Sequence, residues 1–312
     1  MTTRTGPQTY PGASQARRYQ GKFGGDDQEV NVVVLHTTEG RTLPDYGGGA
    51  VAPTLTCVPD FAAKRLKWYQ HFDIDTSARA LLNLPGGVET NTNNVCQVEQ
   101  VGTCDPATRA KWVKSGYVQD KDFIFWPQAP DWALRGVAGF LAWMHTKHGV
   151  PLSGPSKWPA YPTSYGNGAG QRMNDAQWNA FKGVCGHMHV DENDHGDPGA
   201  IDFPKLIAFA KEAAGVPSTP VGQPTYEPYP GEAFFMKSGK PALGKSSPIF
   251  TAMGKRLVAV GCGRYKVGPG PVLGQADVDS YEAWQRACHF TGAAAKWPPG
   301  KTTWDKLKVP NV

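Results

Sequence analysis

The chain has 312 residues and a formal charge of +5; 40% of its residues are hydrophobic, and it contains 37 Gly and 27 Pro. This length favours one large domain plus a smaller one, and the Gly and Pro content argues against a helical bundle. No apolar run approaches the ~20 residues of a membrane span, so we expect no membrane insertion.

The first 27 residues form a polar N-terminal extension without the apolar core of a secretory signal, so we expect synthesis in the cytoplasm. A β-branched run, EVNVVVLH, predicts a buried strand that ends at His36. The stretches RLKWYQHFDID and NNVCQVEQVG predict two further strands.

Two helices are predicted among these strands. DWALRGVAGFLAWMHTKHG has apolar residues at helical spacing and Gly149 as a stop signal. The second helix begins after Asp202, a residue type suited to the N-cap, and runs through FPKLIAFAKEAAG. Strands interspersed with helices predict an α/β domain with a central sheet over residues 28–214.

Residues 215–231 contain five prolines in 17 residues, which predicts an extended linker. Behind it, residues 232–312 show three helical segments, which predict a small all-α module. This part carries 12 Lys and Arg against 5 Asp and Glu, a formal charge of +7. The charge suggests an anionic partner, and because no nucleic-acid-binding motif accompanies it, we do not expect nucleic acid.

The stretch GHMHVDENDHGDPG concentrates residue types that bind metals. Asp197 precedes a proline, which favours a loop over a helix; in an extended chain His187 and His189 would share a face. A catalytic zinc site takes three protein ligands and leaves one position for water. His36 at the end of the buried strand is the best-placed third ligand, and His189 stays open as a replacement for His187.

The motifs VVVLHTTEG, VCQVEQVG and CGHMHVDENDHGDPGAIDF together resemble the zinc-dependent N-acetylmuramoyl-L-alanine amidases of type 2, which share their fold with peptidoglycan recognition proteins. Their order and spacing are similar to those of endolysins from phages of actinobacteria. The resemblance covers residues 28–212 and implies a central mixed sheet flanked by helices. It also implies hydrolysis of the amide between N-acetylmuramic acid and L-alanine, and a holin-type release to the cell wall.

By position, the resemblance makes His36, His187 and Asp197 the zinc ligands. Glu99 falls where the family places a carboxylate that takes a proton from the metal-activated water and returns it to the leaving amine. His195 falls where many members have a Lys or Thr that stabilises the oxyanion. An imidazole there departs from the family and has a charge that varies near neutral pH.

The C-terminal module is similar to small helical peptidoglycan-binding modules, on SYEAWQ and on Gly300, Thr303, Trp304 and Leu307. The preceding KWPPG departs from the usual Asp-Gly turn. The resemblance implies peptidoglycan and anionic wall polymers as partners, and we expect a monomer.

Two other functions stay open. One is a recognition protein that binds peptidoglycan without cleaving it. The other is a cell-wall cysteine peptidase that uses Cys185 or Cys57 with a nearby histidine. The six cysteines include no Cys-x-x-Cys pair, and in a cytoplasmic protein we expect them as free thiols.

Overall fold

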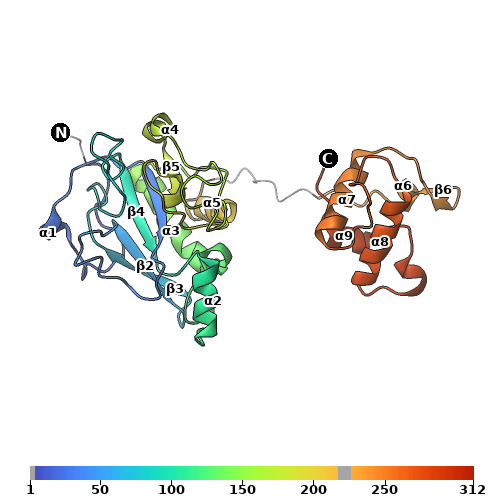
Figure 1. The fold of residues 1–312 in the computed structure, drawn as a ribbon, viewed down its shortest axis with the longest axis horizontal. Helices are drawn as coiled ribbons and strands as arrows, with labels where there is room; N and C mark the ends of the chain where they lie inside the picture. Colours follow the sequence, from blue (N-terminus) through green and yellow to red (C-terminus); the bar gives the residue numbers. More distant parts are fainter. Residues whose placement is uncertain (1–3, 217–225) are drawn as a thin grey trace. The chain divides into compact units, whose positions relative to one another are not determined.

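A computed structural model describes residues 4–216 and 226–312. The chain divides into two compact units, Met1–Ser218 and Thr219–Val312 (Figure 1). Of the predicted linker, residues 215–231, residues 217–225 lie outside the described residues. The boundary at residue 231 is wrong, because Tyr226 forms a bridge with Pro310 and Tyr229 packs against the core of the C-terminal unit.

The N-terminal unit is an α/β domain built on a five-stranded mixed sheet with the strand order β3-β2-β4-β1-β5 (Figure 1). Strand β1 is parallel to β4 and β5, and β2 is parallel to β4 and antiparallel to β3. The strands are β1 (Val32–Thr37), β2 (Leu55–Asp60), β3 (Arg65–Gln70), β4 (Val95–Gln100) and β5 (Gly183–Gly186).

Helices α3 (Asp131–His148) and α5 (Phe203–Ala213) pack together over one face of the sheet. Val33 and Leu35 of β1 belong to the core under these helices, whereas Val32 and Val34 belong to a smaller cluster on the opposite face. Strand β1 is buried on both faces, which explains its continuous apolar sequence. The shorter helices are α1 (Gln20–Phe23), α2 (Pro106–Lys114), α4 (Asp175–Ala180), η1 (Trp126–Gln128) and η2 (His187–His189).

Three of the five strands and both long helices lie where the sequence predicts them. Gly149 ends α3 in the left-handed conformation, and the Asp202 carboxylate caps α5 by accepting from the Lys205 N–H. Strands β2 and β5 were not predicted. Strand β2 contains Pro59, and β5 has only four residues with Gly at both ends, so neither has a clear strand pattern.

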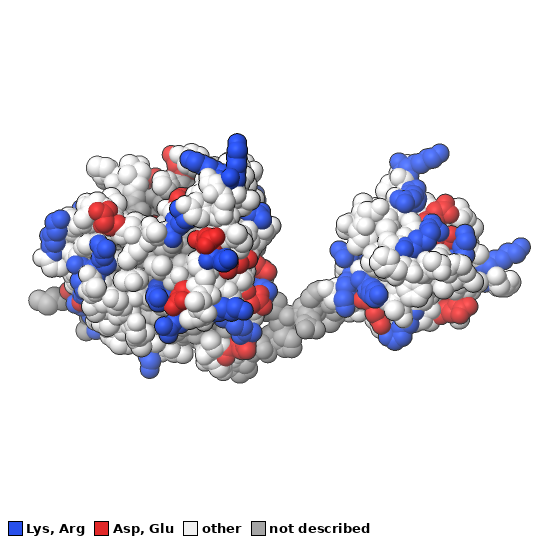
Figure 2. Space-filling view, turned by 90° about the horizontal axis from the view of Figure 1, so that it is seen from below, with Lys and Arg blue, Asp and Glu red and all other residues white. Residues whose placement is uncertain are grey.

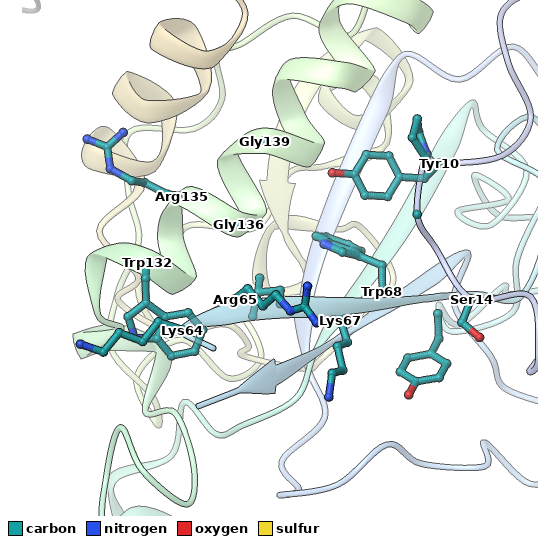
Figure 3. Close-up of a pocket in the computed structure, with 14 residues that line it drawn as sticks. Tyr10, Ser14, Lys64, Arg65, Lys67, Trp68, Trp132, Arg135, Gly136 and Gly139 are labelled. Atoms are coloured by element: carbon teal, nitrogen blue, oxygen red, sulfur yellow. The ribbon is translucent and has the colours of Figure 1, made fainter. Parts of the chain in front are cut away.

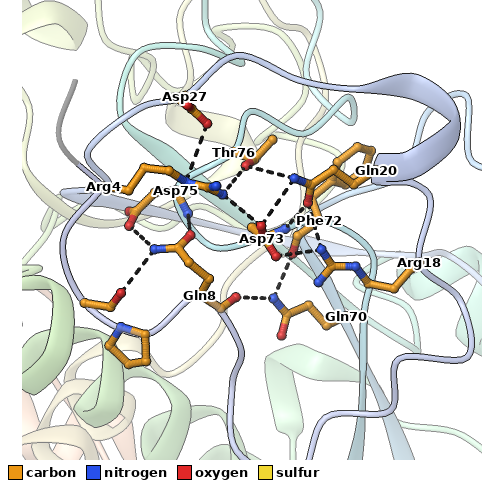
Figure 4. Close-up of polar contacts among 12 residues, drawn as sticks. Arg4, Gln8, Arg18, Gln20, Asp27, Gln70, Phe72, Asp73, Asp75 and Thr76 are labelled. Atoms are coloured by element: carbon orange, nitrogen blue, oxygen red, sulfur yellow. Dashed lines mark hydrogen bonds and ion pairs between the residues drawn. The ribbon is translucent and has the colours of Figure 1, made fainter. Parts of the chain in front are cut away.

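The N-terminal segment belongs to the same unit as the sheet. Arg4 and Arg18 make ion pairs with Asp73 at 2.9 and 2.6 Å, and Gln8 donates to Asp75 at 2.5 Å (Figure 4). Tyr10 packs edge-on against core aromatic rings of β3 and α3. The residues expected to form an extension therefore complete the domain, and its boundary is not at residue 28.

His71, directly after β3, is buried and joins the N-terminal segment to the sheet. Its Nδ1 donates to the Arg17 carbonyl at 2.7 Å, and its Nε2 accepts from the Thr56 hydroxyl at 2.9 Å. Burial lowers the pKa of His71 to about 4, so the folded protein holds this imidazole neutral.

We expect the free energy of unfolding to fall as the pH drops from 6.5 to 4. In that window the unfolded chain protonates His71 and the folded protein does not, which costs about 2–3 kcal/mol at pH 4.5. Urea unfolding at pH 7 and pH 4.5 measures this loss. The His71→Gln variant keeps a donor and an acceptor at this position but has no group that titrates. Between pH 7 and pH 4.5 its free energy of unfolding should therefore fall by about 2–3 kcal/mol less than that of the wild-type protein. An equal fall in the two proteins would contradict the role given to His71.

The C-terminal unit has its own core, in which Phe235, Phe250, Tyr281 and Trp304 are buried. Its helices are α6 (Glu232–Phe235), α7 (Pro248–Ala259), α8 (Gln275–Ala287), η3 (Gly292–Ala295) and α9 (Lys301–Leu307). The unit is not all-α, because β6 (Met236–Lys237) and β7 (Lys240–Pro241) form a small antiparallel pair. Ser238 and Gly239 turn the chain between them with positive φ, a local geometry that helical periodicity does not reveal.

Lys and Arg side chains stand out on the visible face of the C-terminal unit (Figure 2). Among the described residues, no helix has the length and apolar character to cross a lipid bilayer.

Candidate metal centre

The predicted metal ligands meet beside the carboxyl ends of the parallel strands β1 and β5. His36 is near the end of β1, and Glu99 is its direct partner on the adjacent parallel strand β4. His187 follows β5 and begins the short helix η2, and Asp197 lies in the loop beyond. Because β1, β4 and β5 are parallel, their carboxyl ends lie on the same side of the domain.

Three side chains, His36, His187 and Asp197, form a buried group that can hold a metal ion. The Nδ1 atoms of the two histidines are 3.0 Å apart. One Asp197 oxygen is 3.3 Å from the His187 Nδ1, and the other is 3.7 Å from the His36 Nδ1. Two ligands bound at 2.0–2.1 Å with tetrahedral angles lie about 3.3 Å apart, so the three separations fit a first-row metal.

Asn193 fixes the tautomer of His187. The Asn193 Oδ1 accepts from the Leu82 N–H at 2.9 Å and faces the His187 Nε2 at 3.0 Å. Since a carbonyl oxygen only accepts, the Nε2 carries the proton and the Nδ1 presents a lone pair to the centre. A polar partner on the outer nitrogen is the usual support of a metal-binding histidine.

The other two ligands are also held in metal-binding forms. Burial lowers the pKa of His36 well below its ordinary value and keeps the imidazole neutral. Burial opposes the ionisation of Asp197, but the pKa of its carboxyl is lowered overall, in part because the Thr37 N–H donates to it at 3.0 Å. Two imidazoles and one carboxylate are a donor set that suits zinc.

His189 does not belong to this group. Its Nδ1 accepts from the Gly186 N–H at 3.0 Å, and its Nε2 donates to the Lys157 carbonyl at 2.8 Å. Both ring nitrogens are therefore engaged, and the ring packs edge-on against Trp158. The expectation that His187 and His189 share a face is wrong, because η2 turns the chain between them.

Glu99 faces the same centre from β4. Its Oε2 is buried and makes no hydrogen bond to any described residue, although the side chain also lines a cavity. Burial raises the pKa of Glu99 well above its ordinary value, and the nearby Asp197 and Glu39 carboxylates raise it further. A carboxyl group with a raised pKa is suited to accept and return a proton near neutral pH.

His195 lies at the mouth of the centre. Its side chain is 70% exposed, its ring centroid is 4.7 Å from that of His187, and its Nδ1 is 3.8 Å from an Asp197 oxygen. Partial burial lowers the pKa of this imidazole. His195 is thus an accessible polar group beside the ligands.

Two cavities of about 580 and 220 Å³ open on the centre and share Glu39, His195 and Asp197 in their linings. The larger also contains Glu99, Tyr46 and Leu81; the smaller contains Tyr161 and Tyr165. Glu39 was not predicted, although it follows His36 by three residues in the HTTEG motif. It accepts from the Cys104 N–H at 2.9 Å and the Thr37 hydroxyl at 2.7 Å.

Arg172 was also not predicted, because it is distant in sequence from the ligand motif. Its guanidinium donates to the Gly166 carbonyl and to three carbonyls of the ligand loop, those of His187, Val190 and His195, at 2.5–3.2 Å. A single planar cation therefore fixes the loop that supplies two of the three ligands.

We expect Arg172→Ala to weaken the binding of a metal ion at this centre, tested with added Zn²⁺, by about 10- to 100-fold, the range typical of groups that support metal ligands. The Arg172→Lys variant keeps the charge but lacks the forked geometry, and should recover only part of the affinity. Competition with a chromophoric chelator gives the dissociation constants. Unchanged zinc affinity in a folded Arg172→Ala protein would show that the ligand loop keeps its conformation without the hydrogen bonds of Arg172.

The predicted cysteine nucleophiles are poorly placed. Cys57 and Cys185 are fully buried, and burial raises the pKa of both thiols. All six cysteines are free thiols in the structure. A nucleophilic cysteine needs an accessible site that favours the thiolate, which neither residue has.

No protein-family model matches the chain, and no curated protein matches its sequence.

Proposed function

We propose that the protein is a zinc-dependent N-acetylmuramoyl-L-alanine amidase, a phage endolysin that cleaves bacterial peptidoglycan. The observation that carries this proposal is the convergence of His36, His187 and Asp197 in one buried group, with Glu99 on the adjacent strand. The site is open to two cavities, as cleavage of a polymer requires. The resemblance of the three sequence motifs supplies the substrate class.

In this proposal zinc, when bound, supplies Lewis-acid polarisation and makes water a stronger acid. Glu99 accepts the proton of the attacking water, orients that water toward the amide carbonyl and then protonates the leaving amine of L-alanine. His195 donates a hydrogen bond to the oxygen that gains negative charge. The Thr37 N–H, Asn193 and Arg172 hold the ligands in place.

We infer that the C-terminal unit serves as the wall-binding domain that the sequence predicts for residues 232–312. The unit is compact and has its own core, and the +7 charge of residues 232–312 suits an anionic envelope. Tethering such a unit to the catalytic domain raises the residence of the enzyme on its substrate. Peptidoglycan and anionic wall polymers are the proposed partners, with the protein acting as a monomer.

The decisive experiment incubates the zinc-loaded protein with purified actinobacterial walls and measures new L-alanine amino termini. Their appearance supports the amidase. Wall binding without them would favour a non-catalytic recognition protein, the second candidate. The buried Asp197 favours the enzyme, because it completes a three-ligand site.

Removing the C-terminal unit tests its role. Residues 1–218 contain the whole N-terminal unit and its core, so we expect this fragment to fold and to keep the metal centre. It should bind walls more weakly than the full chain and with a shallower dependence on salt. Sedimentation with walls at 50 and 300 mM NaCl measures both, and equal binding by the two proteins would refute the assignment.

A further inference from the structure

We propose that the outer edge of β3 is a docking site for an acidic peptide in an extended conformation. A cavity of about 680 Å³ lies along this edge, and its lining shares no residue with the two cavities of the metal centre. The lining comes from residues 10–14, residues 64–69 and the first half of α3 (Figure 3). This site goes beyond the proposed hydrolysis and does not depend on a metal.

The backbone of β3 presents unused hydrogen-bonding groups to this cavity. Leu66 pairs with Pro59 on β2, and because proline has no N–H, the Leu66 N–H and C=O point away from β2. By the same alternation the Trp68 N–H also points outward. Outside the β2–β3 ladder, no described residue makes a backbone hydrogen bond to any of these three groups.

The protein itself shows that this edge accepts another segment. Ser14 forms a bridge there: its N–H donates to the Trp68 carbonyl at 2.8 Å, and its carbonyl accepts from the Gln70 N–H at 3.0 Å. From Trp68 back to Arg65, no described segment pairs with the outer side of β3, although its inner side stays paired with β2. An added peptide would extend this pairing, as in other cases of strand addition.

Helix α3 leaves space for the peptide side chains. A Cβ atom built on Gly139 would have no atom within 4 Å, so the groove is open there. Leu66 and Trp68 face the helix side, and Trp132 and Tyr10 stand toward opposite ends of the groove (Figure 3). Small apolar side chains on one face of the peptide would fit this surface.

Basic side chains along the groove favour acidic residues on the other face of the peptide. Lys64, Arg65 and Lys67 line the groove, and among the described residues no Asp or Glu does. Arg135 also lines it, but its guanidinium is directed to α5, where it pairs with Glu212. Asp60, which is half-buried, pairs with Arg65 and Lys67, and because both cations are more than half exposed these pairs are weak and can exchange for a ligand. Lysines on an edge strand also repel basic strands, so the same residues that discourage general edge pairing favour an acidic partner.

The pattern therefore fits a peptide in which acidic residues alternate with small apolar ones. The probe is Glu-Val-Glu-Val-Glu-amide with fluorescein on its N-terminal amine, titrated with the full-length protein and followed by fluorescence anisotropy. We expect saturable binding, and no binding of the matched Lys-Val-Lys-Val-Lys peptide. A dissociation constant above about 1 mM for the acidic probe would overturn the proposal.

Two probe variants separate strand addition from simple charge attraction. One carries N-methyl groups on the Glu residues and the other on the Val residues, so each removes alternate main-chain donors without changing charge. We expect at least one of them to lose binding. Unchanged binding of both would overturn the strand-addition geometry.

Protein variants locate the site. Gly139→Leu fills the groove, fits the space around the glycine and raises helix propensity, so the variant should fold and lose binding. Lys64→Glu, at a position with no ion pair to any described residue, should weaken binding about fivefold, and Lys121→Glu at an exposed position serves as the matched control. Full binding by folded Gly139→Leu, or equal effects of the two lysine variants, would place the probe elsewhere and refute the site.

Discussion

Glu99→Gln should reduce the proposed wall hydrolysis by about 100- to 10,000-fold, while the proposed zinc ion stays bound. The amide has the size of the carboxylate but cannot accept the proton of the attacking water. Glu99 is adjacent to His36 across the β1–β4 pair, and none of the three ligand contacts involves it. The ligand group should therefore survive the change.

Release of L-alanine amino termini and the zinc content of the purified variant measure the two effects separately. Glu89→Gln, an exposed carboxylate outside the ligand group, is the matched control and should keep full activity. A Glu99→Gln enzyme with normal turnover would remove Glu99 from the mechanism. Loss of both zinc and activity would instead make it a support of the ligands.

Asp197→Ala should abolish stable zinc binding and with it hydrolysis. The change removes one of three ligands, leaving the two Nδ1 atoms of His36 and His187 3.0 Å apart. Since loss of a group that only supports a ligand already costs about 10- to 100-fold in metal affinity, loss of the ligand itself should cost more. Equilibrium dialysis followed by elemental analysis measures the bound metal.

His189→Gln is the control for this prediction, because His189 is equally buried but uses both ring nitrogens within the protein. It should keep zinc at one equivalent. A chelator should inactivate the wild-type protein, and added Zn²⁺ should restore it, whereas a thiol alkylator should have no effect. Stoichiometric zinc in Asp197→Ala would show that the ligand set is different.

Much of the N-terminal fold was predictable because its signals are local. The apolar run of β1 follows from burial on both faces, and the caps Asp202 and Gly149 act within one turn of α5 and α3. Strands β2 and β5 were missed because their pairing partners, rather than their own composition, make them strands.

The sequence could not decide whether His187 or His189 is the metal ligand. The sequence offers both, two residues apart, in a loop. The η2 turn directs one toward His36 and the other toward the Lys157 carbonyl. Arg172 and Asn193 were missed for a related reason, because a group that supports a ligand carries no motif of its own.

The sequence by itself determined which candidate functional groups the protein has. They are a strand-end histidine, a strand carboxylate, a histidine-rich loop ending in Asp-Pro-Gly, and a basic C-terminal segment. Only the tertiary structure decided that His36 and His187, 151 residues apart, lie 3.0 Å from one another and share Asp197. The physical reason is that the parallel pairing of β1 with β4 and β5 brings their carboxyl ends together, and such non-local pairing leaves no periodic signal in the chain.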